Sequence, residues 1–147
     1  MTVSSIAERY SEALFSTDYE RLGELRHEDF VARWPQSSEV VHGHDRWVEI
    51  TRRFPQSEGD PGVVSGGEKL TVSRIKTPMP FGPPILAMSG GGDTFTLQGQ
   101  IKYPDGSQFH VVAICDIENG KVIGETAYFC EPFEPPEWRA DLVELES

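Results

Sequence analysis

A dipeptide near the end of the chain, Asn119-Gly120, constrains the fold more than any other feature of the sequence. The segments before and after it, 108–118 and 121–131, have the alternating apolar pattern of β-strands. Asn-Gly tolerates the positive φ angles that a two-residue hairpin turn requires. We therefore predict an antiparallel hairpin in which the residues next to the turn pair directly and all other pairs follow by counting.

Counting from the turn also assigns each side chain of the hairpin to one of two faces, because successive side chains of a strand point in opposite directions. One face has no charged residue, so we expect helices or a second subunit to cover it. The other is apolar but has ionisable residues in mid-strand, where they are costly unless they serve a purpose. We interpret this second face as the lining of a pocket. The predicted pocket face comprises His110, Val112, Ile114, Asp116, Ile123, Glu125, Ala127 and Phe129; the uncharged face comprises Phe109, Val111, Ala113, Cys115, Ile117, Val122, Gly124, Thr126, Tyr128 and Cys130.

The first third of the chain has the pattern of helices. Ser5 with Glu8, and Thr17 with Glu20, have the spacing of capping boxes, which predicts that a helix starts at each. A third helix is expected from Gly43–Asp45 onward. Its predicted buried side chains are Trp47, Ile50 and Phe54.

Strands account for most of the remaining chain, with loops rich in glycine and proline between them. Residues 55–67 and 78–92 are predicted loops, and the second suits a lid or the rim of a pocket. Asp105-Gly106 predicts a second hairpin turn. The predicted strands are residues 30–34, 68–77, 93–103, 108–118 and 121–131.

Length and charge argue against several classes of protein. A chain of 147 residues fits one domain, and a net charge of −11 argues against nucleic-acid and membrane partners. No apolar run reaches the roughly 20 residues needed to span a bilayer, and the first residues do not resemble a secretion signal. Cys115 and Cys130 are too few for a disulfide framework, so we expect both to be buried thiols of a cytoplasmic protein.

The order of two helices, a short strand, a third helix and a four-stranded meander resembles the nuclear transport factor 2-like superfamily. Several motifs look like a SnoaL-like subgroup, whose relatives include polyketide cyclases and ketosteroid isomerases. The resemblance implies an α+β fold in which a cone-shaped, curved antiparallel or mixed sheet wraps around three N-terminal helices. It also implies one domain over residues 1–147, with a core at about 5–140 and an acidic C-terminal tail. The matching residues are Glu8–Leu14, Asp18-Tyr19, Phe30–Gln36, Gly43, Tyr103–Gly106, Glu125–Phe129, Glu131–Phe133 and Trp138-Arg139.

Only some of the catalytic residues of ketosteroid isomerases have a counterpart in this sequence. Tyr10 matches the helix-one tyrosine that donates a hydrogen bond to the substrate oxyanion. The general-base position is occupied here by Trp34, and the second oxyanion acid falls near Ile114, so neither group is present. The pocket positions of the family's final strand correspond to Glu125, Ala127 and Phe129.

Glu125 is the first candidate for a catalytic residue. Burial disfavours the charged form of a carboxyl group, which would make Glu125 a candidate acid or base. The alternative is a structural glutamate bound to Arg33, Arg74 or a backbone donor. His110 and Tyr10 are the other catalytic candidates, with a histidine at the pocket mouth and a helix-packing aromatic as their alternatives. The residues expected to bind a ligand are Arg33, Trp34, Trp47, Leu97, Val112, Ile114, Ala127 and Phe129.

The motif His42-Gly43-His44-Asp45 has alternating histidines but resembles a turn that caps a helix, so we predict no metal site there and no cofactor. Two hypotheses follow for the function. One is a cofactor-free isomerase, cyclase or dehydratase acting on a small cyclic or polyketide-like molecule. The other is a non-catalytic binding module with the same apolar pocket. In both cases the uncharged sheet face predicts a homodimer.

Overall fold

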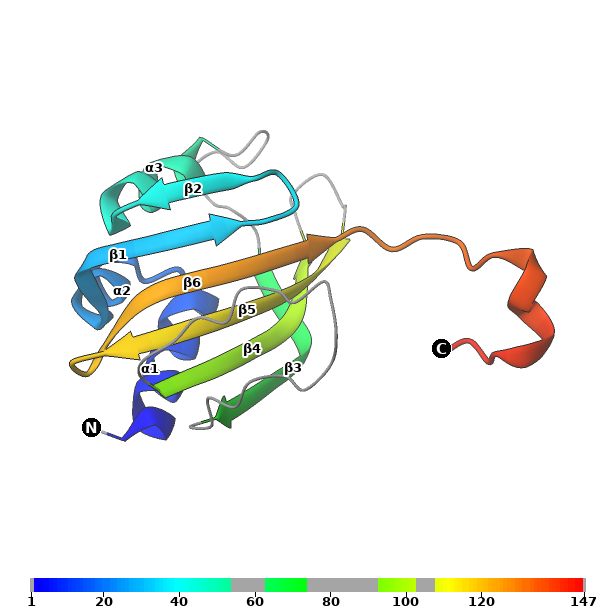
Figure 1. Ribbon diagram of the computed structural model, residues 1–147, viewed down its shortest axis with the longest axis horizontal. Helices are drawn as coiled ribbons and strands as arrows, with labels where there is room; N and C mark the ends of the chain where they lie inside the picture. Colours follow the sequence, from blue (N-terminus) through cyan, green and yellow to red (C-terminus); the bar gives the residue numbers. More distant parts are fainter. Residues whose placement is uncertain (1, 54–62, 74–92, 103–107, 147) are drawn as a thin grey trace, which may run out of the picture.

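A curved six-stranded sheet forms the frame of the protein (Figure 1). The computed structural model describes residues 2–53, 63–73, 93–102 and 108–146. The strand order is β2-β1-β6-β5-β4-β3; β1 and β6 are parallel and the other neighbours are antiparallel, so the sheet is mixed. The strands are β1 (Arg26–Trp34), β2 (Glu39–His42), β3 (Val63–Ser73), β4 (Asp93–Lys102), β5 (Gln108–Glu118) and β6 (Lys121–Cys130).

Helices α1 (Val3–Phe15), α2 (Tyr19–Leu25) and α3 (His44–Arg52) confirm the predicted helical regions. Their caps differ from the prediction. The hydroxyl of Thr2, not Ser5, caps α1 and accepts from the Ser5 N–H at 3.1 Å, while the Asp18 carboxylate caps α2. Thr17 has a φ of 54° and lies in the turn before that cap. Each capping side chain therefore precedes its helix directly, as the free first-turn N–H groups require.

The strands of the first half of the sheet differ from those that the sequence pattern indicated. Strand β1 begins at Arg26 because the chain passes from α2 directly into an extended conformation, and β2 was not predicted. Strand β3 begins at Val63, so the prediction of a loop is wrong for residues 63–67. The predicted lid at 78–92 and the turn at 105–106 lie outside the described residues.

The predicted hairpin turn is confirmed, but its register is not. Asn119 and Gly120 have φ angles of 51° and 77°, and the pairs on either side of the turn begin as counted. A β-bulge at Ile123 then shifts the ladder by one residue, so that Glu125 lies opposite Cys115 and not opposite Ile114. A bulge adds an unpaired residue to one strand, and it reverses the faces of all residues beyond it.

Because of this bulge, the pocket face predicted from the sequence contains some wrong residues. Glu125, Ala127 and Phe129 share the concave face with Ala113 and Cys115. The prediction that His110, Val112 and Ile114 lie on the same face as Glu125 is wrong, because they lie on the convex face. The predicted uncharged face is likewise divided between the two sides of the sheet.

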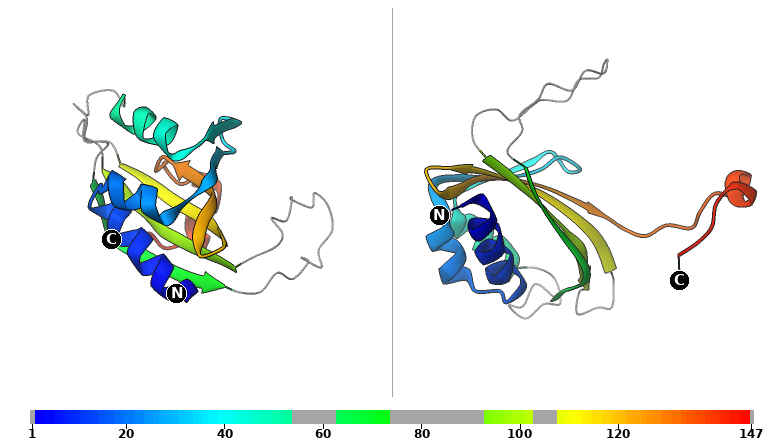
Figure 2. Two further views of the ribbon diagram at one scale, coloured as in Figure 1. Left: turned by 90° about the vertical axis from the view of Figure 1, so that its left-hand side faces the viewer. Right: turned by 90° about the horizontal axis from the view of Figure 1, so that it is seen from below.

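The core fills the space between the concave face and the helices (Figure 2). Its largest wholly buried side chains include Tyr10, Phe30 and Phe95. Three predictions about burial need correction: on α3 the buried residue is Val48, Ile50 is exposed, and Cys130 is exposed. Among the described residues, none of the helices has the length and apolar character needed to cross a lipid bilayer.

Candidate functional site

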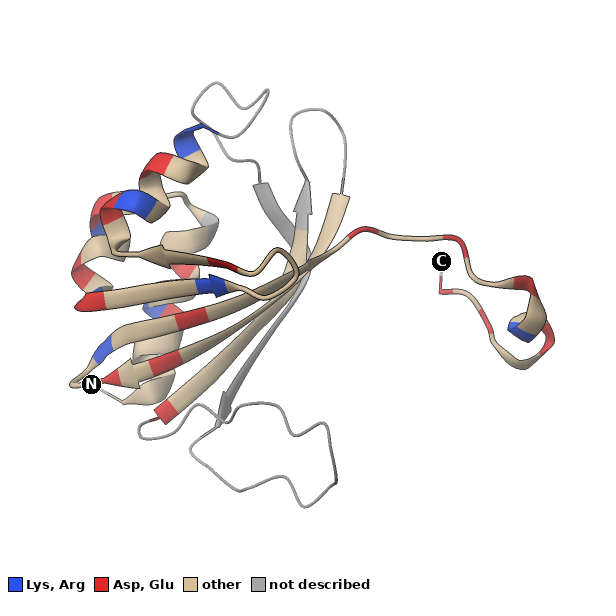
Figure 3. Ribbon diagram, turned by 45° about the horizontal axis from the view of Figure 1, so that its top comes forward, with Lys and Arg blue, Asp and Glu red and all other residues tan. Residues whose placement is uncertain are grey.

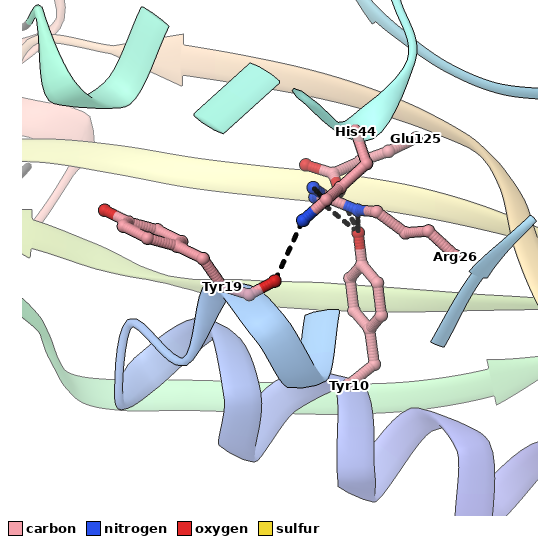
Figure 4. Close-up of polar contacts among 5 residues, drawn as sticks. All are labelled: Tyr10, Tyr19, Arg26, His44 and Glu125. Atoms are coloured by element: carbon pink, nitrogen blue, oxygen red, sulfur yellow. Dashed lines mark hydrogen bonds and ion pairs between the residues drawn. The ribbon is translucent and has the colours of Figure 1, made fainter. Parts of the chain in front are cut away.

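Glu125 lies in the middle of β6, with its carboxylate inside the core (Figure 4). Tyr10 on α1 donates its hydroxyl hydrogen to Glu125 Oε2 at 2.5 Å. The Arg26 Nη2 group donates to the same oxygen at 3.2 Å. Both of these hydrogen bonds fall on Oε2. Among the described residues, nothing donates a hydrogen bond to Oε1.

Arg26, the first residue of β1, connects the parts of this site. Its side chain is fully buried and donates to the Tyr10 hydroxyl oxygen through Nε at 3.0 Å and Nη2 at 2.8 Å. The guanidinium carbon lies 4.1 Å from the ring centroids of both Phe30 and Trp47. Cation–π contacts of this kind are strongest where water is excluded. The cation is therefore held by a hydrogen bond to the carboxylate and by its position over two aromatic rings.

His44, the first residue of α3, holds Arg26 from the other side. Its Nε2 lies 2.8 Å from the Tyr19 carbonyl oxygen, so Nε2 must carry the hydrogen. Nδ1 is then unprotonated and accepts from Arg26 Nη1 at 2.9 Å. Gly23 provides the space for this ring, because a Cβ there would lie 3.0 Å from two of its atoms. The contacts of His44 therefore require a neutral imidazole.

Burial and mutual charge shift the pKa values of these groups. Burial, and then the facing Glu125 carboxylate, raise the pKa of the Tyr10 hydroxyl well above its usual range. Burial alone would lower the pKa of Arg26, but the Tyr10 and Glu125 oxygens outweigh it and raise that pKa. Burial and the Arg26 guanidinium lower the pKa of His44. Burial also raises the pKa of the Cys115 thiol, which makes it a poor nucleophile.

The hydrogen-bond donors of Tyr10 and Arg26 are used within the network itself. Tyr10 has a single hydroxyl hydrogen and gives it to Glu125, so it is not available to a substrate oxygen while the network is intact. The acceptor capacity of Glu125 is not exhausted, because Oε1 takes no hydrogen bond from the described residues. The site therefore offers a ligand the Glu125 carboxylate as a fixed hydrogen-bond acceptor, and it does not offer a pair of hydrogen-bond donors.

Solved structures show what this architecture is similar to. A nuclear transport factor 2-like protein of unknown function from Burkholderia xenovorans matches with a TM-score of 0.65 and 25% identity, over 98% of this chain and 94% of that one. A proposed ketosteroid isomerase from Kribbella flavida matches with a TM-score of 0.65 and 22% identity, over 97% and 88%. A proposed SnoaL-like polyketide cyclase from Mesorhizobium loti matches with a TM-score of 0.52 and 17% identity, over 87% and 99%.

The chain has the nuclear transport factor 2-like fold. No family model and no curated protein matches the sequence itself. The predicted fold class is confirmed, including the helices inside a curved mixed sheet.

The nuclear transport factor 2-like cone brings some of the predicted site residues together. Leu97 and Ala127 are buried on the concave face with Glu125. Trp34 and Phe129 are partly buried and meet edge to face, with ring centroids 6.4 Å apart. Trp47 is also inside, but it packs on Arg26.

The cone separates the other predicted residues from Glu125. Arg33 is exposed on the convex face, so the predicted ion pair of Glu125 with Arg33 is wrong; Arg26 is its partner. Arg74 lies outside the described residues. His110 is exposed, and Val112 and Ile114 share its face.

An open depression of about 440 Å³ lies on the convex face, where the sequence did not predict one; its lining is Asp29, Val31, Arg33, Asp116, Ile117, Glu118, Ile123 and Gly124.

Sequence reasoning missed Arg26, His44 and Gly23. Arg26 follows the second helix directly, and a charged residue is ordinary at the end of a helix, so the sequence did not single it out. The motif that contains His44 was interpreted as a turn that caps a helix and not as a metal site, whereas the two ring nitrogens of His44 bond to Arg26 and Tyr19. A usable signal was Gly23 within a helix, since a glycine there costs about 1 kcal/mol relative to alanine and points to a close neighbour.

Removing either partner of the buried ion pair should strongly destabilise the fold. Arg26→Met leaves the Glu125 charge in the core and Glu125→Gln leaves the Arg26 charge, so each should lower the free energy of unfolding by about 3–5 kcal/mol. The double variant should lose much less than the sum of the two. Urea denaturation measures all three. The matched control is Arg53→Met, which breaks the exposed Arg53–Glu49 pair and should change little. Additive losses at Arg26 and Glu125 would contradict the coupling.

Gly23→Ala should destabilise the protein, although alanine normally stabilises a helix by about 1 kcal/mol relative to glycine. The reason is the His44 ring, because two of its atoms would lie only 3.0 Å from the new methyl group. In a His44→Ala background the same substitution should become stabilising. Thermal and urea unfolding of the four proteins test this reversal of sign. An equal gain in both backgrounds would show that the ring does not need the space.

Stability should decrease as the pH falls from about 7.5 to 5.5. The pKa of His44 is lower in the folded state than the value of about 6.5 expected when unfolded. The folded state therefore binds fewer protons, so the stabilisation is complete above the unfolded-state pKa and is lost as the pH falls through this range. His44→Asn should flatten this slope, measured by urea denaturation at several pH values. His42→Asn, at an exposed position nearby, is the control and should keep it.

Proposed function

We propose that the protein binds one small, largely apolar molecule inside the cone and that Glu125 Oε1 accepts a hydrogen bond from it. The observation that carries this proposal is the unequal hydrogen bonding of the two carboxylate oxygens of Glu125. Tyr10 and Arg26 both donate hydrogen bonds to Oε2, which fixes the orientation of the group. An acceptor left over in an apolar interior favours a ligand that brings its own donor.

The exposure pattern around Glu125 supports access to the carboxylate. Leu97 keeps 6% exposure, Ala113 keeps 4% and Glu125 keeps 5%, whereas Phe95 and Cys115 are fully buried. These three residues, which are buried but retain slight contact with solvent, are close in the sheet, because Leu97 pairs with Ala113 and β6 runs beside it. Along β6, Ala127 separates Glu125 from the rim residue Phe129. The small side chain of Ala127 leaves more space between Phe129 and the Glu125 carboxylate than a larger side chain would.

The chemistry of the site narrows the class of ligand. It should be mostly apolar, to match the concave face, and should carry a hydroxyl or enol group as the donor for Oε1. Small cyclic and polyketide-like molecules have this combination. Solved neighbours described as a proposed polyketide cyclase and a proposed ketosteroid isomerase are consistent with such a ligand.

A second candidate function is cofactor-free proton transfer on the same ligand. It is favoured by the fixed anionic Oε1, which is suited to removing a proton from a carbon next to a carbonyl group. Tyr10 and Arg26 would then be positioning residues for Glu125. An oxyanion role for Tyr10 requires its hydrogen bond to Glu125 to break. His110 has no part in this scheme because it lies on the convex face.

Glu125→Gln distinguishes the two candidates. Small cyclic, polyketide-like and steroid compounds are screened by thermal shift, and each mixture that shifts is analysed by mass spectrometry and chromatography. A ligand at 100 times its Kd should stabilise the wild-type protein by about 2.7 kcal/mol. If the protein is a binding module, the ligand is unchanged, and Glu125→Gln weakens binding at least tenfold by removing the anionic acceptor. If it is an enzyme, the ligand is converted and Glu125→Gln stops conversion.

Glu118→Gln is the matched control, because it changes a glutamate of the same hairpin at an exposed position. It should leave affinity and turnover unchanged. All variants are compared at a temperature where circular dichroism shows that they are folded. Equal affinity and turnover in wild type and Glu125→Gln would contradict both candidates.

A further inference from the structure

The last residues of the described chain, 131–146, leave the sheet and extend away from the domain (Figures 1 and 2). Pro132, Pro135 and Pro136 follow β6 closely, and prolines cannot donate to a strand ladder, so the sheet ends there. The short 3-10 helix η1 (Glu137–Leu142) comes next. We call residues 131–146 the C-terminal tail.

The C-terminal tail presents large apolar side chains to water. Phe133 is 73% exposed, Trp138 77%, Leu142 79% and Leu145 73%. The most exposed large apolar side chain elsewhere in the described chain, Val40, reaches only 49%. Apolar side chains gathered in this way on one segment typically mark a surface that another molecule covers.

The convex face of the sheet also has no cover among the described elements. The helices pack on the concave face (Figure 2). The charged residues of the convex face include Asp29, Arg33, Asp116, Glu118 and Lys121, which lie on β1 and near the β5–β6 turn. On β4, β5 and β6, the stretch from Thr96, Ile114 and Thr126 to Gln100, His110 and Cys130 has no Asp, Glu, Lys or Arg. Charge depletion is typical of the centre of a protein interface. Its other residues include Val31, Val40, His42, Thr94, Thr96, Gln98, Gln100, His110, Val112, Ile114, Thr126, Tyr128 and Cys130.

The tail and the convex face are continuous along the chain. Tyr128 and Cys130 are exposed on the convex side of β6, and the tail starts at the next residue. Strand β6 lies inside the sheet, between β1 and β5. The match to the Burkholderia xenovorans structure covers 98% of this chain, so it extends into the tail. The tail is therefore part of the shared architecture.

We infer that the C-terminal tail is an exchanged arm that packs across the convex face of a second copy of this chain. In a two-fold dimer each chain gives its tail and receives the other, so both apolar surfaces are covered. The acidic residues of the tail lie between its apolar ones (Figure 3), which places carboxylates at the polar rim and within reach of Arg33. The interface combines tail residues Phe133, Trp138 and Leu142 with a face centred on Val112, Ile114 and Tyr128.

Sedimentation and light scattering of the full chain test the association. Wild type should behave as a particle of twice the chain mass. The double variant Trp138→Ser/Leu142→Ser removes two exposed side chains from outside the core, so it should fold normally and raise the dimer Kd at least tenfold. The matched control is Ile50→Ser, which removes an exposed apolar side chain from α3 and should leave the Kd unchanged. A monomeric wild type, or an unchanged Kd in the double variant, overturns the inference.

Cross-linking tests whether the tail is exchanged. Both partners carry Cys130→Ser; one chain with a purification tag also carries Ala140→Cys, and an untagged chain carries Gln98→Cys. After mixing, a short bismaleimide should link tagged to untagged chains. A single chain with both Ala140→Cys and Gln98→Cys should give a linked dimer and not an internal link. Links confined to one chain, or no links, show that the tail does not reach a second copy and overturn the inference.

Discussion

The structure depends on the enclosure of a positive charge. Arg26 has a fully buried guanidinium, and moving an ion out of water costs several kcal/mol after relaxation. The cost is offset because the group has matched partners. The Glu125 carboxylate and the Tyr10 hydroxyl accept from its Nε and Nη2 groups, the His44 nitrogen accepts from Nη1, and the guanidinium carbon lies over two aromatic rings. These partners come from α1, α3 and β6. The enclosed charge therefore fixes how three elements sit against β1.

The sequence predicted the order of elements well, because hydrophobic period and turn chemistry are local properties. The Asn119-Gly120 turn has the expected positive φ angles, and β5 has the predicted bounds. The bulge at Ile123 was missed because the count from the turn assumed a regular ladder. Gly124, the next residue, was a usable signal, since a glycine within a strand often marks a bulge. Because one residue is unpaired at the bulge, the count from the turn assigned His110 to the wrong face. Local patterns determine which segments are strands, and long-range packing determines their register.

The site was predicted in part. Tyr10 and Glu125 were selected from a resemblance and from a mid-strand charge, and they form a direct hydrogen bond. Arg26 and His44 were not recognised, because their importance arises from contacts between segments far apart in the sequence. A lone arginine near a helix end is usually solvated, so composition cannot reveal its burial. Gly23 was the clue, since its missing Cβ makes room for the His44 ring.

The parallel pairing of β1 with β6 has a consequence for the synthesis of the chain. Arg26 is made early, and its counter-ion follows 99 residues later, in the strand next to the C-terminal tail. Until β6 emerges from the ribosome, the helices and first strands hold a cation with no carboxylate to enclose. They cannot complete a stable core around it, because closing this long loop must come first. A chain that stops before Glu125 thus keeps exposed the apolar surface that the complete core would bury, and such incompletely folded chains are bound by chaperones or degraded by proteases.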